Sequence, residues 1–425
     1  MRPIGLFRRN PDFARFWAGE TVSLFGTQIS GLALPLTALL VLNVSATEMG
    51  VLRALAFLPF LVVALPFGAL ADRHPRRPLM IAANLIRAPL VMLVPGLVAT
   101  GLLSLPVLAA IVLAIGVCTV LFEVCWLAYV PDIVARDDLI RANGRVSASA
   151  SAAEFAGPGL GGALTQWLTA PFALLANGLT YLLSVASLLS IRSREQPRAT
   201  AERRIAGEIA GGLAFIAREP FLRLLTVTGA AYNFCYMFVE ALLILYLVQQ
   251  LGLTPGVVGL VIALGALGGL AGAACAGTLL HRFRFGRVFA GAVLIGYAGP
   301  VLIPAVAAGT PGGTALVVAG LFLMRAGLAV SNVAGTSLRQ AVTPPEMMGR
   351  MTAGMRTISW GIGTTGALVG GLAGDLLGLR SALWVAVAGF LATAVIVLFS
   401  RIPGLSALPE PGRPDVAATS PAEHR

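Results

Sequence analysis

Apolar segments long enough to cross a lipid bilayer follow one another along almost the whole chain. A helix needs about 20 mainly apolar residues to cross a hydrocarbon core of about 30 Å. Twelve such segments can be placed, at residues 16–42, 49–71, 78–100, 103–129, 146–168, 172–191, 221–247, 256–280, 288–308, 314–337, 354–377 and 381–400. Only 12% of the residues are charged, about half the share found in soluble proteins. The sequence therefore predicts an all-α membrane protein with twelve transmembrane helices.

The arginines predict how these helices are oriented. All thirty basic residues of the chain are arginine. They gather near the N-terminus and in alternate connections, at 73–77, 136–145, 192–218, 282–287 and 339–350, whereas the intervening connections at 43–48, 101–102, 169–171, 249–254 and 308–313 contain none. Because cytoplasmic loops are enriched in basic residues, we predict a multi-pass plasma-membrane protein with both termini in the cytoplasm. Arg380 breaks the pattern, and we expect it to pair with Asp375 at the last external turn.

A longer polar segment divides the chain into two halves. We predict a six-helix bundle at residues 1–191, a cytoplasmic linker at 192–220, a second six-helix bundle at 221–401 and a disordered cytoplasmic tail at 402–425. Four apolar residues of the linker recur at helical spacing, namely Ile205, Ile209, Leu213 and Ile216. This spacing predicts an amphipathic helix on the cytoplasmic surface of the membrane.

Short motifs recur in the two halves at nearly one offset. The matching pairs are 68–73 with 277–282 and 161–162 with 370–371, both 209 positions apart, and 144–148 with 349–353, 205 positions apart. Each pair lies at an equivalent point of its half. Such a repeat indicates two pseudo-symmetric bundles that arose by duplication.

The connection between the second and third segments resembles the best-known motif of the major facilitator superfamily. Its glycine, leucine, aspartate and basic cluster correspond to Gly68, Leu70, Asp72, Arg73, Arg76 and Arg77. In the fifth segment, the core of the superfamily's antiporter motif is similar to Gly157, Pro158, Gly161 and Gly162. Residues 13–26 and 131–143 are similar to the branch that contains macrolide-efflux proteins and the enterobactin exporter. The resemblance implies the major facilitator fold and proton antiport by alternating access.

Asp72 is the candidate for a conformational latch. We hypothesise that its carboxylate docks near residues 352–356, at the start of the eleventh segment, because a helix N-terminus favours a nearby anion. Gly68 lies one turn earlier and would let the helices approach closely. The alternative is an ordinary turn whose arginines only set the topology.

Ionisable residues inside the segments are costly to bury, so they are candidates for function. Glu154 and Glu123 are the first candidates for proton coupling and Glu240 is the third, since a glutamate among apolar groups can hold a proton and release it when water enters. Arg87 and Arg325 are the expected partners within the membrane. The alternative for each glutamate is a structural ion pair with one of them. Two further charged residues, Glu20 and Arg53, are close enough to an interface to extend toward water.

Six aromatic residues are candidates for lining a cavity that takes a bulky apolar substrate: Trp126, Tyr232, Phe234, Tyr236, Phe238 and Trp360. Ligand cavities are lined mainly by apolar and aromatic side chains. Packing in the core is the alternative for each of them.

Other functional classes lack the residues that they need. A membrane enzyme would need a nucleophile or a metal set, and the three histidines, His74, His281 and His424, have no ligand spacing. An ATP-driven pump would need a phosphate-binding loop with a lysine, and the chain has no lysine. A receptor would need a sizeable soluble domain. We expect no enzymatic activity, no cofactor, no metal and no nucleic-acid partner.

We therefore predict a secondary transporter, active as a monomer in the lipid bilayer. Together with the resemblance, the sequence favours export of an amphipathic small molecule, such as a drug, a macrolide or a siderophore-like metabolite, in exchange for protons. An importer or a uniporter of a small nutrient is the alternative within transport. A dependence of transport on the pH gradient would separate the two.

Overall fold

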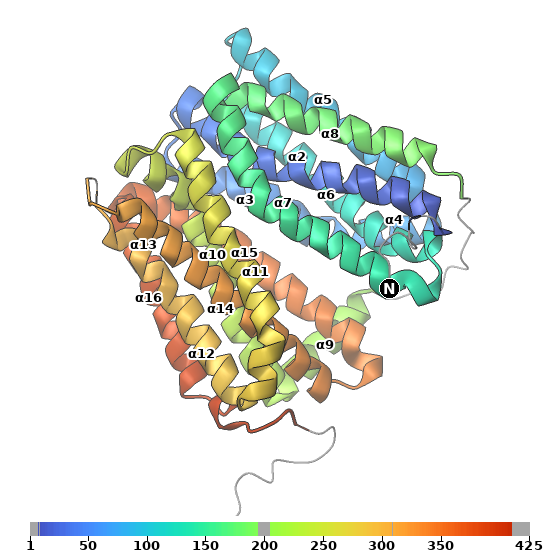
Figure 1. The fold of residues 1–425 in the computed structure, drawn as a ribbon, viewed down its shortest axis with the longest axis vertical. Coiled ribbons are helices and arrows are strands. Elements are labelled where there is room, and N and C mark those ends of the chain that lie inside the picture. The colour runs from blue at the N-terminus through green and yellow to red at the C-terminus, as the bar shows by residue number, and fades with distance from the viewer. Residues whose placement is uncertain (1–6, 8, 194–204, 308, 410–425) are drawn as a thin grey trace, which may run out of the picture.

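The computed structural model describes residues 7, 9–193, 205–307 and 309–409, and its regular secondary structure in these ranges is helical (Figure 1). The first half contains α2 (Pro11–Leu42), α3 (Ala46–Val62), α4 (Ala64–Arg73), α5 (Arg76–Ala99), α6 (Leu105–Ile133), α7 (Leu139–Leu168) and α8 (Ala170–Ser190). The second contains α10 (Pro220–Leu245), α11 (Pro255–Arg282), α12 (Phe285–Ala298), α13 (Leu302–Ala305), α14 (Gly313–Val342), α15 (Met348–Leu377) and α16 (Leu379–Leu398). Between them lies α9 (Ile205–Arg218).

Each predicted span coincides with one helix or with two helices in direct succession. Nine of the described helical segments are long and apolar enough to cross a membrane, or ten if the bent pair α3 and α4 counts as one. The helices α7 and α15 are each 30 residues long but rich in glycine, serine and threonine. The all-α membrane fold is thus confirmed, whereas the count of twelve is not confirmed span by span.

The bend between α3 and α4 has a local cause. The two helices meet at 48°, and Pro66 lies in the first turn of α4. Proline has no N–H group, so Pro66 cannot donate to the carbonyl oxygen of Val62, one turn earlier. The helix breaks at Val63 between them.

The helices form two bundles that meet at one end (Figure 1). The first bundle holds α2 to α8 and the second holds α10 to α16, and they touch where α3 packs on α15 and α7 packs on α11. Figure 1 shows them diverging toward the end that carries α9. We call this end the arginine-rich side, since it holds the connections at 73–76 and 134–139. The contact end holds the connections without arginine.

Glycine allows the backbones to approach at the contact end. A Cβ atom on Gly162 of α7 would lie 2.8 Å from the Cα atom of Gly259 on α11. A Cβ atom on Gly371 of α15 would lie 3.1 Å from the Cα atom of Gly50 on α3. Gly162 and Gly371 occupy equivalent positions in the two repeats, so the same close packing of a glycine on the opposite backbone occurs at both contacts between the bundles.

The neighbouring glycines pack inside each bundle. A Cβ atom on Gly161 would lie 3.1 Å from the backbone of α2, and one on Gly370 would lie 2.8 Å from a backbone oxygen of α10. Successive helical residues point about 100° apart, so each Gly-Gly pair serves two different partners. One glycine packs against its own bundle and the next against the other bundle.

The linker and the tail are described in part. Helix α9 packs along the start of α15, where Ile216 is buried whereas Leu213 is exposed. Residues 402–404 form a helical turn, and Gly286 of α12 donates a backbone hydrogen bond of 3.0 Å to Leu405. The tail predicted from 402 is therefore ordered at its start. Residues 194–204 and 410–425, the rest of the two predicted segments, lie outside the described residues.

Candidate functional site

A cavity of about 920 Å³ lies between the two bundles. Its lining comes from α7 of the first bundle and from α10, α11, α12, α14 and α15 of the second. It includes Gln340 and Met348, near the ends of α14 and α15 at the arginine-rich side. The contacts of α3 with α15 and of α7 with α11 close the opposite end. The cavity therefore opens toward the arginine-rich side.

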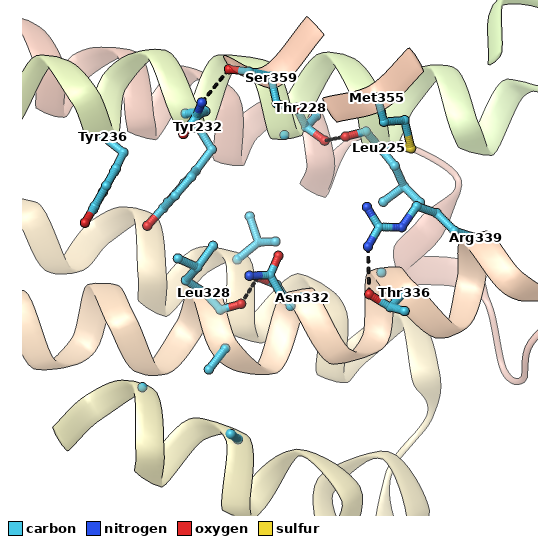
Figure 2. A pocket seen from close by; sticks show the side chains of 18 of the residues that line it. Leu225, Thr228, Tyr232, Tyr236, Leu328, Asn332, Thr336, Arg339, Met355 and Ser359 are labelled. Atoms are coloured by element: carbon cyan, nitrogen blue, oxygen red, sulfur yellow. Dashed lines mark hydrogen bonds between the residues drawn. The ribbon is translucent and has the colours of Figure 1, made fainter. Parts of the chain in front are cut away.

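Three of the six aromatic candidates line this cavity: Tyr232, Tyr236 and Trp360. Figure 2 shows Tyr232 and Tyr236 pointing from α10 toward the space beside α14. Residues four apart share one face of a helix, which explains why both tyrosines line the cavity.

The other three aromatic candidates do not line this cavity. Phe234 and Phe238 also share a face, but that face lines a separate groove formed with α15 and α16. Trp126 packs against an apolar cluster inside the first bundle. Aromatic composition alone does not tell which face of a helix meets the cavity.

A network of four charged side chains joins the bundles at the deep end of the cavity. Arg325 Nη1 lies 2.6 Å from Glu154 Oε1, and Arg53 Nη2 lies 2.8 Å from Glu240 Oε2. Arg325 Nη2 is also 4.0 Å from Glu240 Oε1. Glu154 and Arg53 belong to the first bundle, whereas Arg325 and Glu240 belong to the second. Each close pair therefore bridges the two bundles, and the structure brings together three of the residues singled out by sequence.

Arg53 is the member of this network that sequence reasoning missed. It was expected to extend toward an interface, yet its side chain is only 21% exposed and is paired with Glu240. The depth of Arg53 could have been found from the capping box formed by Ser45 and Glu48, because this box fixes the start of α3 at Ala46. Arg53 is the eighth residue of that helix, about 10 Å from its beginning at 1.5 Å per residue.

A second group of ionisable residues lies inside the first bundle. The buried Arg87 guanidinium lies 4.7 Å from the ring centre of Phe122 and 4.4 Å from that of Tyr181. Glu20 and Glu123 interact electrostatically with this guanidinium. One carboxylate oxygen of Glu20 is buried without a hydrogen-bond partner among the described residues, and the residue as a whole is partly buried. Arg87 is the partner of this group rather than of Glu154.

The predicted latch residues tie their own bundle together. Arg76 is buried and donates to Asp132 Oδ2 at 2.6 Å and to the carbonyl oxygen of Ala128 at 2.8 Å, both on α6. Arg77 donates to the carbonyl oxygen of Leu189 on α8.

Asp72 is not docked on α15 in this conformation. Its side chain is 67% exposed, and its carboxylate lies 3.8 Å from Arg76. A Cβ atom on Gly68 would meet nothing within 4 Å, so the close approach expected at this glycine is absent here. The docking predicted for Asp72 is therefore not made in the part of the chain that the structure describes.

A docked aspartate is found at the opposite, closed end. Asp375, near the C-terminus of α15, accepts hydrogen bonds of 2.9 Å from the Ser45 hydroxyl and from the backbone N–H groups of Ala46 and Thr47. These three donors form the N-terminus of α3 in the other bundle. The expected pair of Asp375 with Arg380 was wrong, because Arg380 instead donates to backbone oxygens at the end of the α12 and α13 segment.

The family model described as Major Facilitator Superfamily matches residues 16–365. The chain belongs to the major facilitator superfamily. Macrolide efflux protein A of Streptococcus pyogenes is 28% identical over 250 residues, which cover 57% of this chain and 60% of that protein. The match thus spans less than two thirds of the curated relative.

Solved superfamily members share the fold at low sequence identity. The nucleoside transporter NupG superposes with a TM-score of 0.76 at 9% identity, covering 91% of this chain and 98% of that one. A bacterial homologue of the iron transporter ferroportin gives 0.68 in its inward-facing state, at 17% identity, and 0.55 in its outward-facing state, at 19% identity. Both comparisons cover 91% of this chain and 98% of the other. The resemblance to the superfamily recognised in the sequence is thus confirmed, and the solved structures show that the chain shares their fold.

Proposed function

We propose that this superfamily member is a proton-coupled exporter of amphipathic small molecules. It would act as a monomer in the plasma membrane, with both termini and the arginine-rich side in the cytoplasm. The distribution of arginine supports this orientation, because cytoplasmic loops are enriched in basic residues. In this orientation the cavity would face the compartment from which an exporter collects its substrate. The local similarity to macrolide efflux protein A supports the direction of transport.

The ion pair between Glu154 and Arg325 is the observation that carries this proposal. Glu154 lines the cavity and its side chain is 54% exposed, so water from the cavity can reach the carboxylate. The same carboxylate holds Arg325 of the opposite bundle at 2.6 Å. A proton on Glu154 would remove one charge from a network that joins the bundles. Proton binding and the contact between the bundles are therefore linked through one residue.

The transport cycle follows from that link. In the present conformation, Glu154 holds Arg325, and in the proposed cycle this is the state after the proton has left toward the cytoplasm. Substrate that binds in the cavity would weaken the contact between the bundles, so that the contact end opens. A proton from outside would then neutralise Glu154 during the return. Glu240 is the second candidate, because it contacts both arginines of the network.

The test uses inside-out vesicles that contain the protein and an imposed pH gradient. A fluorescent pH indicator follows proton efflux when amphipathic compounds are added. Glu154→Gln should abolish proton movement evoked by a substrate. Glu346→Gln, which removes an exposed carboxylate in the turn before α15, should leave it unchanged. Substrate movement that ignores the pH gradient would instead support the alternative of a uniporter.

A further inference from the structure

The charged residues around the cavity are not balanced. The lining contains three arginines, Arg325, Arg339 and Arg356, and one acidic residue, Glu154. Arg325 and Glu154 satisfy each other at 2.6 Å. The other two guanidinium groups therefore remain as an excess of positive charge on the wall formed by the second bundle.

Arg339 and Arg356 have no carboxylate within ion-pair distance among the described residues. Arg339 is half-buried on α14 and donates to the Thr336 hydroxyl at 2.7 Å (Figure 2). Arg356 of α15 lies over the ring of Trp360, 5.4 Å from its centre. Glu123 of the first bundle interacts with Arg356 only over a longer range. Arg339 is partly withdrawn from water without an ionic partner, which is unfavourable and favours an anionic ligand. Arg356 is exposed on the cavity wall, so its guanidinium group is accessible to the same ligand.

The deeper wall offers another donor beside apolar surface. The Tyr232 hydroxyl is buried and has no hydrogen-bond partner among the described residues, and the whole residue is 6% exposed. Tyr232 also packs against Tyr297, with ring centres 5.0 Å apart. Both rings line the cavity, as do Phe289 and Trp360. A ligand here would meet aromatic surface at one end and cationic donors at the other.

We infer that the substrate of this cavity is an amphipathic organic anion. Its carboxylate, sulfonate or phosphate group is held by Arg339 and Arg356 near the mouth, and its apolar part packs on Tyr232, Tyr297 and Trp360. Guanidinium groups bind such oxyanions through short, charge-assisted hydrogen bonds. The inference rests on the proposed function in that it names the substrate class of the same cavity.

Equilibrium binding tests this inference without any pH gradient. The full chain in lipid nanodiscs is dialysed against three probes that share one ring system, namely anionic pyrenebutyrate, uncharged pyrenebutyramide and cationic pyrenebutyl trimethylammonium. Empty nanodiscs give the lipid background. The anion should bind at least about tenfold more tightly than the amide, which corresponds to about 1.4 kcal/mol. The cation should bind more weakly than either.

Arginine variants locate the binding groups. Arg339→Gln and Arg356→Gln should each weaken binding of the anion by about tenfold and leave binding of the amide almost unchanged. Arg339→Lys should retain most of the affinity, and this also shows that the site folds. Arg287→Gln, which removes an exposed charge on α12 outside the cavity, is the matched control.

The outcomes separate the substrate class from the transport mechanism. A cation or an amide that binds as tightly as the anion, or failure of all three probes to bind, overturns the inference. Loss of anion affinity in the Arg287→Gln control to the same extent as in the two cavity variants also overturns it. Selective binding of the anion without proton movement in vesicles would leave this inference standing and refute proton coupling.

Discussion

At the scale of single residues, Asp375 joins the two bundles through one carboxylate group. Its two oxygens accept three hydrogen bonds of 2.9 Å from the N-terminus of α3, where the helix dipole also favours a negative charge. Because the site is exposed to solvent, we assign the charge roughly 1 kcal/mol. A contribution of this size from one carboxylate would shift the equilibrium between molecules open at the arginine-rich side and molecules open at the contact end, but would not fix either conformation.

Asp375→Asn should move the population toward molecules that are open at the contact end. The amide keeps one acceptor oxygen but loses the charge, so the equilibrium should shift by about fivefold. Spin labels at Leu102 and Thr310, in a background without the four native cysteines, report the distance between the bundles by pulsed electron resonance. Asp137→Asn, an exposed aspartate at the other end of the molecule, is the control. An unchanged distance distribution in Asp375→Asn would show that this contact carries no weight.

The charged residues of the site were largely predictable from sequence, but their pairing was not. Glu154, Glu240 and Arg325 stand out because a charge inside an apolar segment is costly. Arg53 was missed because its depth depends on where α3 begins, and hydropathy alone does not give that point. The partner of each charge depends on how the two bundles pack, which a single sequence does not encode in any local pattern.

At the scale of elements, the glycine contacts set how closely the bundles can approach. A Cβ atom on Gly371 would lie 2.5 Å from the carbonyl oxygen of Ala46 and 3.0 Å from the Cα atom of Thr47. Both atoms are backbone, so α3 itself must move to make room. By contrast, a Cβ atom on Gly361 of the same helix would meet only the Leu61 side chain, at 3.7 Å.

Gly371→Ala should therefore destabilise the present conformation. Overpacking of this kind costs about 1–3 kcal/mol, so the same spin labels should report molecules that are opened at the contact end, with slower transport. Gly361→Ala adds the same methyl group to α15 and should change neither the distance distribution nor the rate. Equal effects of the two variants would show that helix propensity, rather than the contact, is responsible.

The sequence predicted the positions of the helices well. At the arginine-rich side, however, α7 and α15 extend further than the predicted spans. Hydropathy marks the thickness of the bilayer, whereas α7 begins at Leu139 rather than at 146, and α15 begins at Met348 rather than at 354. These helices continue past the apolar region into polar sequence. Pro66 could have indicated the break at Val63, but the segment is apolar throughout and was therefore predicted as one continuous span.

At the scale of the whole molecule, the observed contact of Asp375 and the proposed contact of Asp72 lie at opposite ends, with the roles of the two halves exchanged. At the closed end, an aspartate near the C-terminus of α15 docks on the N-terminus of α3. At the open end, Asp72 lies at the C-terminus of α4, and α15 begins on that side. The proposed docking of Asp72 on the start of α15 would therefore mirror the contact of Asp375. In the proposed cycle, the two contacts would belong to opposite states.

This reciprocity predicts how the two aspartates combine. Asp72→Asn should favour the present conformation, because it weakens only the state that is closed at the arginine-rich side. Asp375→Asn should favour the other state. Since the residues lie at opposite ends of the molecule, their effects should add, and the double variant should return close to the wild-type distance distribution. If Asp72→Asn leaves that distribution unchanged and the double variant behaves like Asp375→Asn alone, the connection at 68–77 only ties α4 and α5 to their own bundle, and the balance between the states lies elsewhere.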